Sequence, residues 1–168
     1  MVKIGIFFGS MSGNTRLVAE MIHSKLSDHE VSVFDIFETS PHEIDKFDNL
    51  IFGAPSWGKM ELHEDWRKFL RRMKKVDLSN KKIALFGLGD QIMFSNAFAD
   101  SIGILYDELK DQGCQIVGNW KAGDYMFKKS HSLNGDKFLG LVIDEDNQSE
   151  LTENRIDKWL NEILPHFS

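Results

Sequence analysis

A hydroxyl-rich loop near the start of the chain is the first feature of the sequence that could do chemistry. It covers residues 9–15 (GSMSGNT), directly after an apolar run and directly before a helical pattern. A helix N-terminus offers unpaired backbone N–H groups and a partial positive charge, and both suit a phosphate. Ser10, Ser12 and Thr15 add hydroxyl donors, and Gly13 lets the backbone approach a ligand closely. A plain helix cap needs fewer hydroxyls, so we expect a phosphate ligand here.

Two common phosphate-binding motifs are absent from the sequence. No GxxxxGK[ST] motif occurs, so no lysine is placed to reach the β- and γ-phosphates of a nucleoside triphosphate. No GxGxxG motif occurs either, and the nearest match, Gly87-Leu88-Gly89, continues with Asp90 and Gln91. That continuation disfavours a dinucleotide pyrophosphate. A loop of hydroxyls and amides, with Arg16 as its only nearby cation, suits one terminal phosphate monoester.

Two later loops carry aromatic side chains that could hold a flat ring. Residues 55–61 (PSWGKME) follow an apolar run, and Trp57 could stack there on a heteroaromatic ring. Residues 88–96 (LGDQIMFSN) follow another apolar run. Their glycine allows backbone groups to face a ring edge, and Phe94 is a second stacking candidate. An isolated Trp usually packs into a domain edge, but the position of Trp57 across from the phosphate loop favours a ligand.

Short apolar runs alternate with longer amphipathic segments along the chain. Short runs rich in β-branched and aromatic residues are typical of strands, and near-continuous apolar character indicates a parallel sheet covered on both faces. The strand candidates are residues 2–8, 31–35, 49–54, 82–87, 115–119 and 138–143. Apolar residues at helical spacing occupy residues 17–26, 66–73, 98–109 and 156–163, the last with Thr152 as N-cap. This alternation predicts a doubly wound α/β fold, whose ligand lies beyond the carboxyl ends of the strands.

Composition narrows the class of protein further. The 168 residues suit one domain, residues 1–168, with 42% hydrophobic and 27% charged side chains. A net charge of −6 argues against nucleic acid as a partner. A single cysteine, Cys114, allows no internal disulfide, and the scattered histidines predict no metal site. No apolar run is long enough to cross a membrane and no signal-peptide pattern occurs, so we expect a cytoplasmic protein without membrane insertion.

The stretch from Ile6 to Thr15 (IFFGSMSGNT), with Ala19 beyond it, resembles the FMN-phosphate signature of the flavodoxin family. The two aromatic loops and residues 141–148 (LVIDEDNQ) resemble those of long-chain flavodoxins, and the likeness covers essentially the whole chain, being nearest to the cyanobacterial type. It implies a five-stranded parallel sheet in the order 2-1-3-4-5, with an insertion in the fifth strand that matches residues 121–137.

The resemblance also implies roles for individual residues. Ser10, Ser12, Asn14 and Thr15, with the backbone of residues 11–15 (Met11 and Gly13 included), hold the FMN phosphate. Trp57 and Phe94 lie on opposite faces of the flavin, the backbone of residues 88–90 (Leu88, Gly89 and Asp90) meets the pyrimidine edge, and Ser56 and Asp146 contact the ribityl chain. Three positions depart from the family pattern: Phe94 replaces the usual Tyr, and Met60 and Met93 stand where many members have Gly.

The implied function is a low-potential one-electron carrier, with FMN shuttling between the neutral semiquinone and the hydroquinone in place of ferredoxin or alongside it. No nucleophile–base pair appears in the sequence, so we expect an electron-transfer protein that serves redox enzymes and not an enzyme. We expect the Gly58-Lys59 peptide to flip on reduction, because glycine adopts positive φ at little cost. We also expect the following carboxylates to gather at the flavin edge and lower the second reduction potential: Glu61, Glu64, Asp65, Asp90, Asp144, Glu145 and Asp146.

Partners and rivals follow from the same reasoning. By resemblance, the partners are redox proteins with basic docking faces, such as ferredoxin–NADP reductase, photosystem I or ferredoxin-dependent reductases. We expect this chain to be a monomer. The alternative is a flavodoxin-like NAD(P)H-dependent quinone or nitro reductase, although no second nucleotide site is evident. A phospho-acceptor signalling module would need acidic residues after the first strand, where Gly9 and Ser10 stand.

Overall fold

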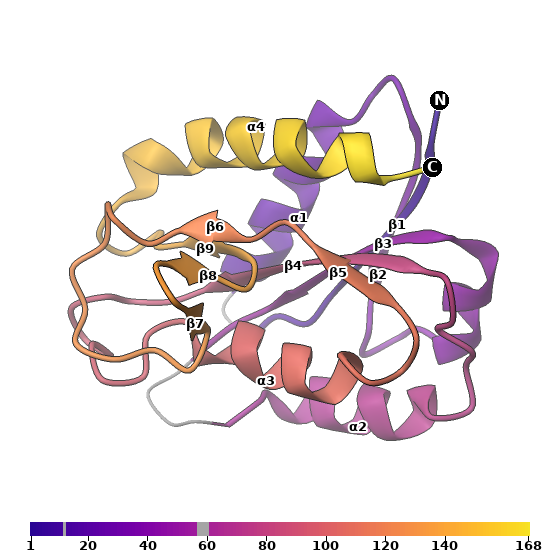
Figure 1. Ribbon diagram of the computed structural model, residues 1–168, viewed down its shortest axis with the longest axis horizontal. Helices are drawn as coiled ribbons and strands as arrows, with labels where there is room; N and C mark the ends of the chain where they lie inside the picture. The colour runs from indigo at the N-terminus through magenta and orange to yellow at the C-terminus, as the bar shows by residue number, and fades with distance from the viewer. Residues whose placement is uncertain (12, 57–60) are drawn as a thin grey trace.

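A parallel sheet runs through the middle of the computed structural model, which describes residues 1–11, 13–56 and 61–168 (Figure 1). The strand order is β2-β1-β3-β4-β5, and β9 pairs with β4 beside β5. This confirms the predicted sheet and its order. The strands are β1 (Lys3–Phe8), β2 (Glu30–Asp35), β3 (Asn49–Ala54), β4 (Lys82–Leu88), β5 (Gln115–Val117) and β9 (Leu141–Ile143).

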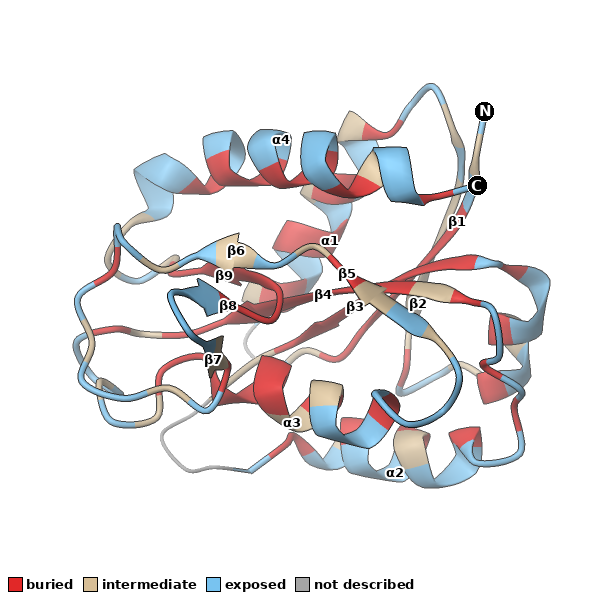
Figure 2. Ribbon diagram, in the orientation of Figure 1, coloured by how far each residue is buried: buried red, intermediate tan, exposed pale blue. Residues whose placement is uncertain are grey.

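Four α-helices cover the two faces of this sheet, as a near-continuous apolar strand pattern requires. Helices α1 and α4 lie above the sheet in Figure 1, and α2 and α3 lie below it. Figure 2 shows that each helix turns its buried stripe toward the sheet. The helices are α1 (Asn14–Lys25), α2 (Glu64–Met73), α3 (Asp100–Leu109) and α4 (Thr152–Ile163), and the 3₁₀ turns are η1 (Pro41–Lys46), η2 (Ser149–Leu151) and η3 (Leu164–His166).

The core is divided by the sheet into two apolar clusters. One contains Ile6 and Val18 with Trp159, which packs between α4 and the sheet. The other contains Phe52 and Trp66, whose indole Nε1 donates a hydrogen bond to the Gly53 carbonyl at 2.9 Å. Alternate residues of each strand point to opposite faces, so every central strand contributes to both clusters. The predicted helical stripes are therefore confirmed as core faces, except at Leu17, which is exposed.

The fifth strand is interrupted, and a glycine lies at each end of the interruption, Gly118 and Gly140. The strand β5 ends at Val117 because Gly118 has φ of 90°, and a Cβ there would lie 2.7 Å from both Ile163 and Trp159. The chain returns at Gly140, where a Cβ would lie 2.3 Å from the Leu85 carbonyl oxygen of β4. The prediction of one strand over residues 138–143 is therefore wrong, since Leu141–Ile143 forms β9 while Phe138 belongs to a separate small sheet.

The excursion between β5 and β9 carries a small antiparallel sheet of order β6-β8-β7. Its strands are β6 (Trp120–Lys121), β7 (Leu133–Asn134) and β8 (Lys137–Phe138). Asn134 pairs with Lys137 across a two-residue turn in which Gly135 has φ of 67°, so the turn expected at Asn134-Gly135 is confirmed. The insertion predicted over residues 121–137 is confirmed in kind and extends slightly beyond those limits.

The start of α4 differs from the sequence-based expectation. Thr152 is the first helical residue and not the N-cap, which is Leu151. The Thr152 hydroxyl donates to the Glu145 carboxylate instead of accepting from the backbone of its own helix. A partner on a neighbouring loop has therefore displaced the local cap, and it ties α4 to the segment that follows β9.

Tyr125 fastens the excursion to the sheet. Its hydroxyl donates to the Val142 carbonyl at 2.6 Å and accepts from the Trp120 indole at 2.9 Å, and the side chain is buried. We expect Tyr125→Phe to lower the free energy of unfolding by about 1–3 kcal/mol, because the buried Val142 carbonyl and the partly buried Trp120 indole both lose their partner. Urea unfolding measures this change. Tyr106→Phe is the control, and equal midpoints for the two variants would contradict the assignment.

No helix in the described part of the chain is both long and apolar enough to cross a bilayer.

Candidate functional site

The N-terminus of α1 is built to receive an anion. Gly13 is the N-cap, with φ of 90°, and its carbonyl accepts from the Leu17 amide at 2.9 Å. The Ser10 hydroxyl accepts from the Gly13 amide at 3.0 Å and so holds the loop closed. No acidic residue stands in the first turn, and no side chain among the described residues caps its amides. A Cβ at Gly13 would meet nothing within 4 Å, so the loop is open on that side. The donors and the space fit a phosphate.

The remaining residues of this loop divide between surface and interior. Met11 is exposed, Asn14 is half-buried and Thr15 is buried. Ser12 lies outside the described residues. The Arg16 guanidinium pairs with Asp35 at 2.8 Å and lies 4.9 Å over the Phe8 ring, so this cation is held at the end of β2.

Ser56 begins the loop after β3 and ties it to α3. Its hydroxyl donates to Ser101 Oγ at 2.7 Å and accepts from the Ser101 amide at 2.9 Å. The Ser56 amide donates to the Leu88 carbonyl at 3.1 Å. The hydroxyl is thus engaged within the chain, and Ser56 holds two loops and a helix together at this edge. The expected roles of Trp57, Gly58, Lys59 and Met60 fall outside the described residues.

The loop after β4 is pinned at both of its ends. The Gly89 amide donates to the Ile143 carbonyl at 3.0 Å, and a Cβ at Gly89 would lie 2.9 Å from the Phe98 ring. Asp90 Oδ1 accepts from the amides of Ile92 (3.0 Å) and Met93 (2.8 Å). This turn presents Phe94 at the surface with 37% of its area exposed. An aromatic ring half out of the protein is available for stacking.

Asp144, at the end of β9, organises the loops from beneath. It is fully buried, and its carboxylate accepts from the Gln91 amide (3.0 Å) and side chain (2.7 Å). It also accepts from the Asn147 amide (3.0 Å) and side chain (3.0 Å). The Asn147 side-chain amide reaches Asp90 Oδ1 as well, at 2.8 Å. The role of Asp144 is therefore to join the loops after β4 and β9 and not, as expected, to sit exposed at a ligand edge.

These loops enclose a hollow at the carboxyl edge of the sheet. Its lining brings together seven of the predicted site residues, includes Glu145, which was expected among the carboxylates at the flavin edge, and adds Pro55, which was not expected. The seven are Asn14, Ser56, Leu88, Gly89, Asp90, Phe94 and Asp146. Pro55 directly follows β3, and its place at a strand end was the signal that could have found it, since strand ends carry the ligand loops in this fold class.

The hollow is acidic, and its carboxyl groups interact. Burial, together with the charges of Asp90, Asp144 and Glu145, raises the pKa of Asp146. Burial alone would also raise the pKa of Asp90, but hydrogen bonds from Met93, Asn147 and Ile92 hold that pKa below its usual value. A negative field therefore faces any ligand here, and the anion-binding end of the site must lie at the N-terminus of α1.

The other expected acidic residues lie elsewhere. Glu64 and Asp65 are in the first turn of α2, where they complement the helix dipole, with Arg71 and Arg72 in the last turn. Glu61 precedes the helix and lines a depression between α2 and α3. None of these three acidic residues lines the hollow as the described residues define it.

Comparison with known proteins identifies the family of this chain. The model of the family described as flavodoxin matches residues 6–159. The chain is 46% identical to a flavodoxin of Buchnera aphidicola subsp. Acyrthosiphon pisum (strain APS), over all of this chain and 99% of that one. The chain belongs to the flavodoxin family.

The expected likeness to cyanobacterial flavodoxins is confirmed, although the Buchnera sequence is more similar. The chain is 39% identical to the flavodoxin of Synechocystis sp. (strain ATCC 27184 / PCC 6803 / Kazusa), over 98% of both chains. Among solved structures, it is similar to a Fusobacterium nucleatum flavodoxin bound to flavin mononucleotide, with a TM-score of 0.94 and 31% identity over all of both chains. The family therefore accounts for the fold and for the small sheet inserted in the fifth strand.

No cluster of three or more His, Cys, Asp or Glu side chains suited to a metal occurs in residues 1–11, 13–56 and 61–168.

Proposed function

We propose that this chain binds FMN non-covalently and carries single electrons between redox proteins. The observation that carries the proposal is the hollow itself, which brings the first residue of α1 together with the loops after β3, β4 and β9, at a helix N-terminus that no described side chain caps. FMN needs an anion site at one end and a flat, partly apolar site at the other. The start of α1 supplies the first, and Phe94 with the backbone around Gly89 supplies the second.

The protein's own residues bind, orient and tune the cofactor. FMN supplies the redox chemistry, because its ring accepts and releases single electrons. The amides at the start of α1, with Ser10, Asn14 and Thr15, hold the phosphate. The pinned turn around Asp90 positions Phe94 against the ring, and the neighbouring carboxylates disfavour added negative charge. The roles of Ser12, Trp57, Gly58 and Lys59, and of Met11 and Gly13 in the phosphate loop, remain predictions from the family resemblance.

The partners we propose are redox proteins with basic docking faces: ferredoxin–NADP reductase, photosystem I or ferredoxin-dependent reductases. A net charge of −6 and the carboxylates around the hollow support this choice, because opposite charges steer encounter. Ile92 and Met93 expose apolar side chains next to Phe94, which gives such a partner a contact surface at the cofactor. A monomeric state and a cytoplasmic location stay predictions.

The reduction potential of bound FMN should respond to Asp146. We expect Asp146→Asn to raise it by about 10–30 mV, since a charge at ~8 Å in a water-like dielectric contributes about 0.5 kcal/mol, or ~20 mV. The difference should shrink as the pH falls toward the raised pKa of Asp146, where the parent also loses this charge. Potentiometric titration measures it. Asp136→Asn, in the β7–β8 turn, is the control, and a lowered potential for Asp146→Asn would contradict the field argument.

Adding the apoprotein to FMN tests the function directly. We expect one FMN to bind per chain, with its fluorescence quenched and its absorbance spectrum shifted by the protein environment. NADPH alone should not be oxidised in steady state, whereas a cytochrome should be reduced when a ferredoxin–NADP reductase is added. A colourless protein that leaves FMN fluorescence unchanged would reject the proposal. Steady NADPH oxidation without a reductase would favour a quinone or nitro reductase of the same fold.

A further inference from the structure

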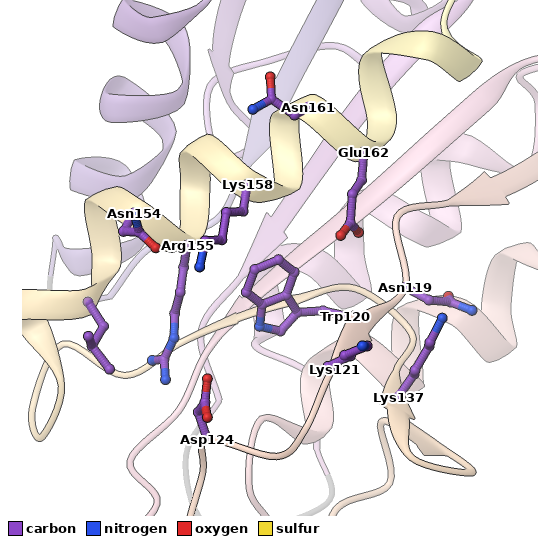
Figure 3. A pocket seen from close by; sticks show the side chains of 11 residues that line it. Asn119, Trp120, Lys121, Asp124, Lys137, Asn154, Arg155, Lys158, Asn161 and Glu162 are labelled. Carbon is purple, nitrogen blue, oxygen red and sulfur yellow. The ribbon is translucent and has the colours of Figure 1, made fainter.

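A second cavity, beside the excursion, lies away from the cofactor hollow. It has a volume of about 520 Å³ and is formed along one side of α4, between that helix, the strand β6 and the start of β8 (Figure 3). It shares no lining residue with the hollow among the described residues. Small-molecule sites usually have volumes of about 300–1,000 Å³. The cavity is thus large enough for a ligand of its own.

Arg155 is the unusual residue of this cavity. Its side chain lines the cavity although only 5% of the residue is exposed. Its guanidinium carbon lies 4.1 Å from the centre of the Tyr125 ring. Both terminal nitrogens are buried, and neither has a hydrogen-bond partner in the described part of the chain. A buried charge is costly unless it is paired, and the stacking contact satisfies none of the guanidinium N–H donors. The arginine therefore lacks an anionic partner.

The lining of the cavity favours an anion as that partner. Lys121, Lys137 and Lys158 accompany Arg155, while Asp124 and Glu162 are the acidic members, so four positive charges face two negative ones. None of the four cations forms an ion pair with any residue that the structure describes. A locally positive cavity in a chain of net charge −6 runs against the overall balance of the protein. Electrostatics alone would draw a phosphate to it.

An aromatic ring stands at the centre of the same cavity. Figure 3 shows the Trp120 indole between Arg155 and Lys158 on one side and Lys137 on the other. The indole N–H is fixed by the hydroxyl of Tyr125, while the residue is only half-buried. A partly exposed, immobilised indole can stack on a planar base. The amides of Asn119, Asn154 and Asn161 can bond to ring edges and hydroxyls.

We propose that this cavity is a second ligand site, which binds a nucleoside phosphate with its phosphate toward Arg155 and Lys158 and its base against Trp120. The four cations bind the phosphate, the indole stacks on the base, and the asparagine amides bond to the polar edges of the ligand. FMN is held at a different place, so one chain can carry both ligands at once.

Titration of AMP into the FMN-loaded protein tests the proposal by nitrogen-15 NMR. Because FMN occupies its own hollow, AMP cannot borrow the phosphate loop of α1. We expect the indole N–H signal of Trp120 to shift with a Kd at or below about 1 mM. The Trp159 indole, bonded to the Gly118 carbonyl, should stay in place. Inorganic phosphate and adenosine should each bind at least about tenfold more weakly than AMP, since each makes only part of the contacts.

Two variants separate a ligand site from a structural feature. Lys158→Gln should weaken AMP binding about three- to tenfold, while Lys75→Gln, an exposed lysine on the far side of the molecule, should leave it unchanged. Arg155→Leu should abolish AMP binding without lowering the melting temperature, because it removes an unpaired buried charge. If Arg155→Leu does not fold, the pair Lys158→Gln and Lys75→Gln decides the question.

Three results would overturn the proposal. The first is a Trp120 indole signal that does not shift with AMP up to about 10 mM. The second is inorganic phosphate that binds as tightly as AMP, and the third is a Lys158→Gln variant that binds AMP as tightly as the parent does. Quenching of FMN fluorescence is a separate measurement, so failure of this site is distinguishable from failure of the cofactor site.

Discussion

Replacing Asp144 by alanine should weaken FMN binding by about 100-fold, which corresponds to about 2.7 kcal/mol, and should lower the free energy of unfolding by about 3 kcal/mol. The carboxylate is fully buried and is the shared acceptor for Gln91 and Asn147. Its removal leaves several buried N–H donors without a partner, at a cost of about 1–3 kcal/mol each before relaxation. The loops after β4 and β9 then lose the connection that fixes the hollow.

FMN fluorescence quenching and urea unfolding measure the two effects of Asp144→Ala. Asp146→Ala is the matched control, because Asp146 belongs to the same loop, is exposed and lines the hollow. We expect the control to change either quantity by less than about 1 kcal/mol. Asp144→Asn should fall between the two, since it keeps the shape of the side chain but turns a donor toward donors. Equal effects of Asp144→Ala and Asp146→Ala would show that the loops do not depend on the buried carboxylate.

Gly140→Ala should destabilise the protein by about 3 kcal/mol or more, the largest effect we expect from a single added methyl group. A Cβ at this position would lie 2.3 Å from the carbonyl oxygen and 2.9 Å from the carbonyl carbon of Leu85. Both atoms are backbone atoms of β4 in the centre of the sheet, so they cannot move aside as a side chain can. Either β9 must leave β4 or the sheet must deform.

Chemical denaturation of Gly140→Ala and Gly123→Ala measures this effect against a matched control. Gly123 lies in the same excursion, and a Cβ there would meet nothing within 4 Å. Its substitution should be neutral or slightly stabilising, because alanine has less conformational freedom in the unfolded chain. A Gly140→Ala protein as stable as the parent would show that the sheet absorbs the displacement.

The main elements of the fold were predictable because their signals are local. Apolar runs bounded by Gly, Asn or Asp marked the strands, and helical spacing marked the helices. The split of residues 138–143 was hidden, because it depends on the approach of Gly140 to Leu85, which no local pattern encodes. The displaced cap at Thr152 likewise depends on Glu145, a residue in a neighbouring loop.

The site was predictable in its loops and less so in its supports. The structure brings Asn14, Asp90 and Phe94 to one hollow, as expected where strand ends and a helix start carry ligands in this fold class, and their roles toward a ligand stay predictions. The roles of buried side chains depend on partners distant in sequence, so Asp144 was expected at the flavin edge and not as a buried acceptor that joins two loops. Arg155 did leave one: it lies four residues before Trp159 on the buried stripe of α4, where an arginine is rarely found.

The interrupted fifth strand also affects how the molecule meets copies of itself. An exposed sheet edge can template the addition of a strand from another chain, and short edges resist this. At one edge, the strands β5 and β9 have three residues each and are separated by the excursion, so no long continuous backbone ladder is offered there. The opposite edge, β2, runs unbroken for six residues. Aggregation by strand addition should therefore begin at β2. The excursion between β5 and β9 interrupts the opposite edge of the sheet and so makes strand addition there less favourable.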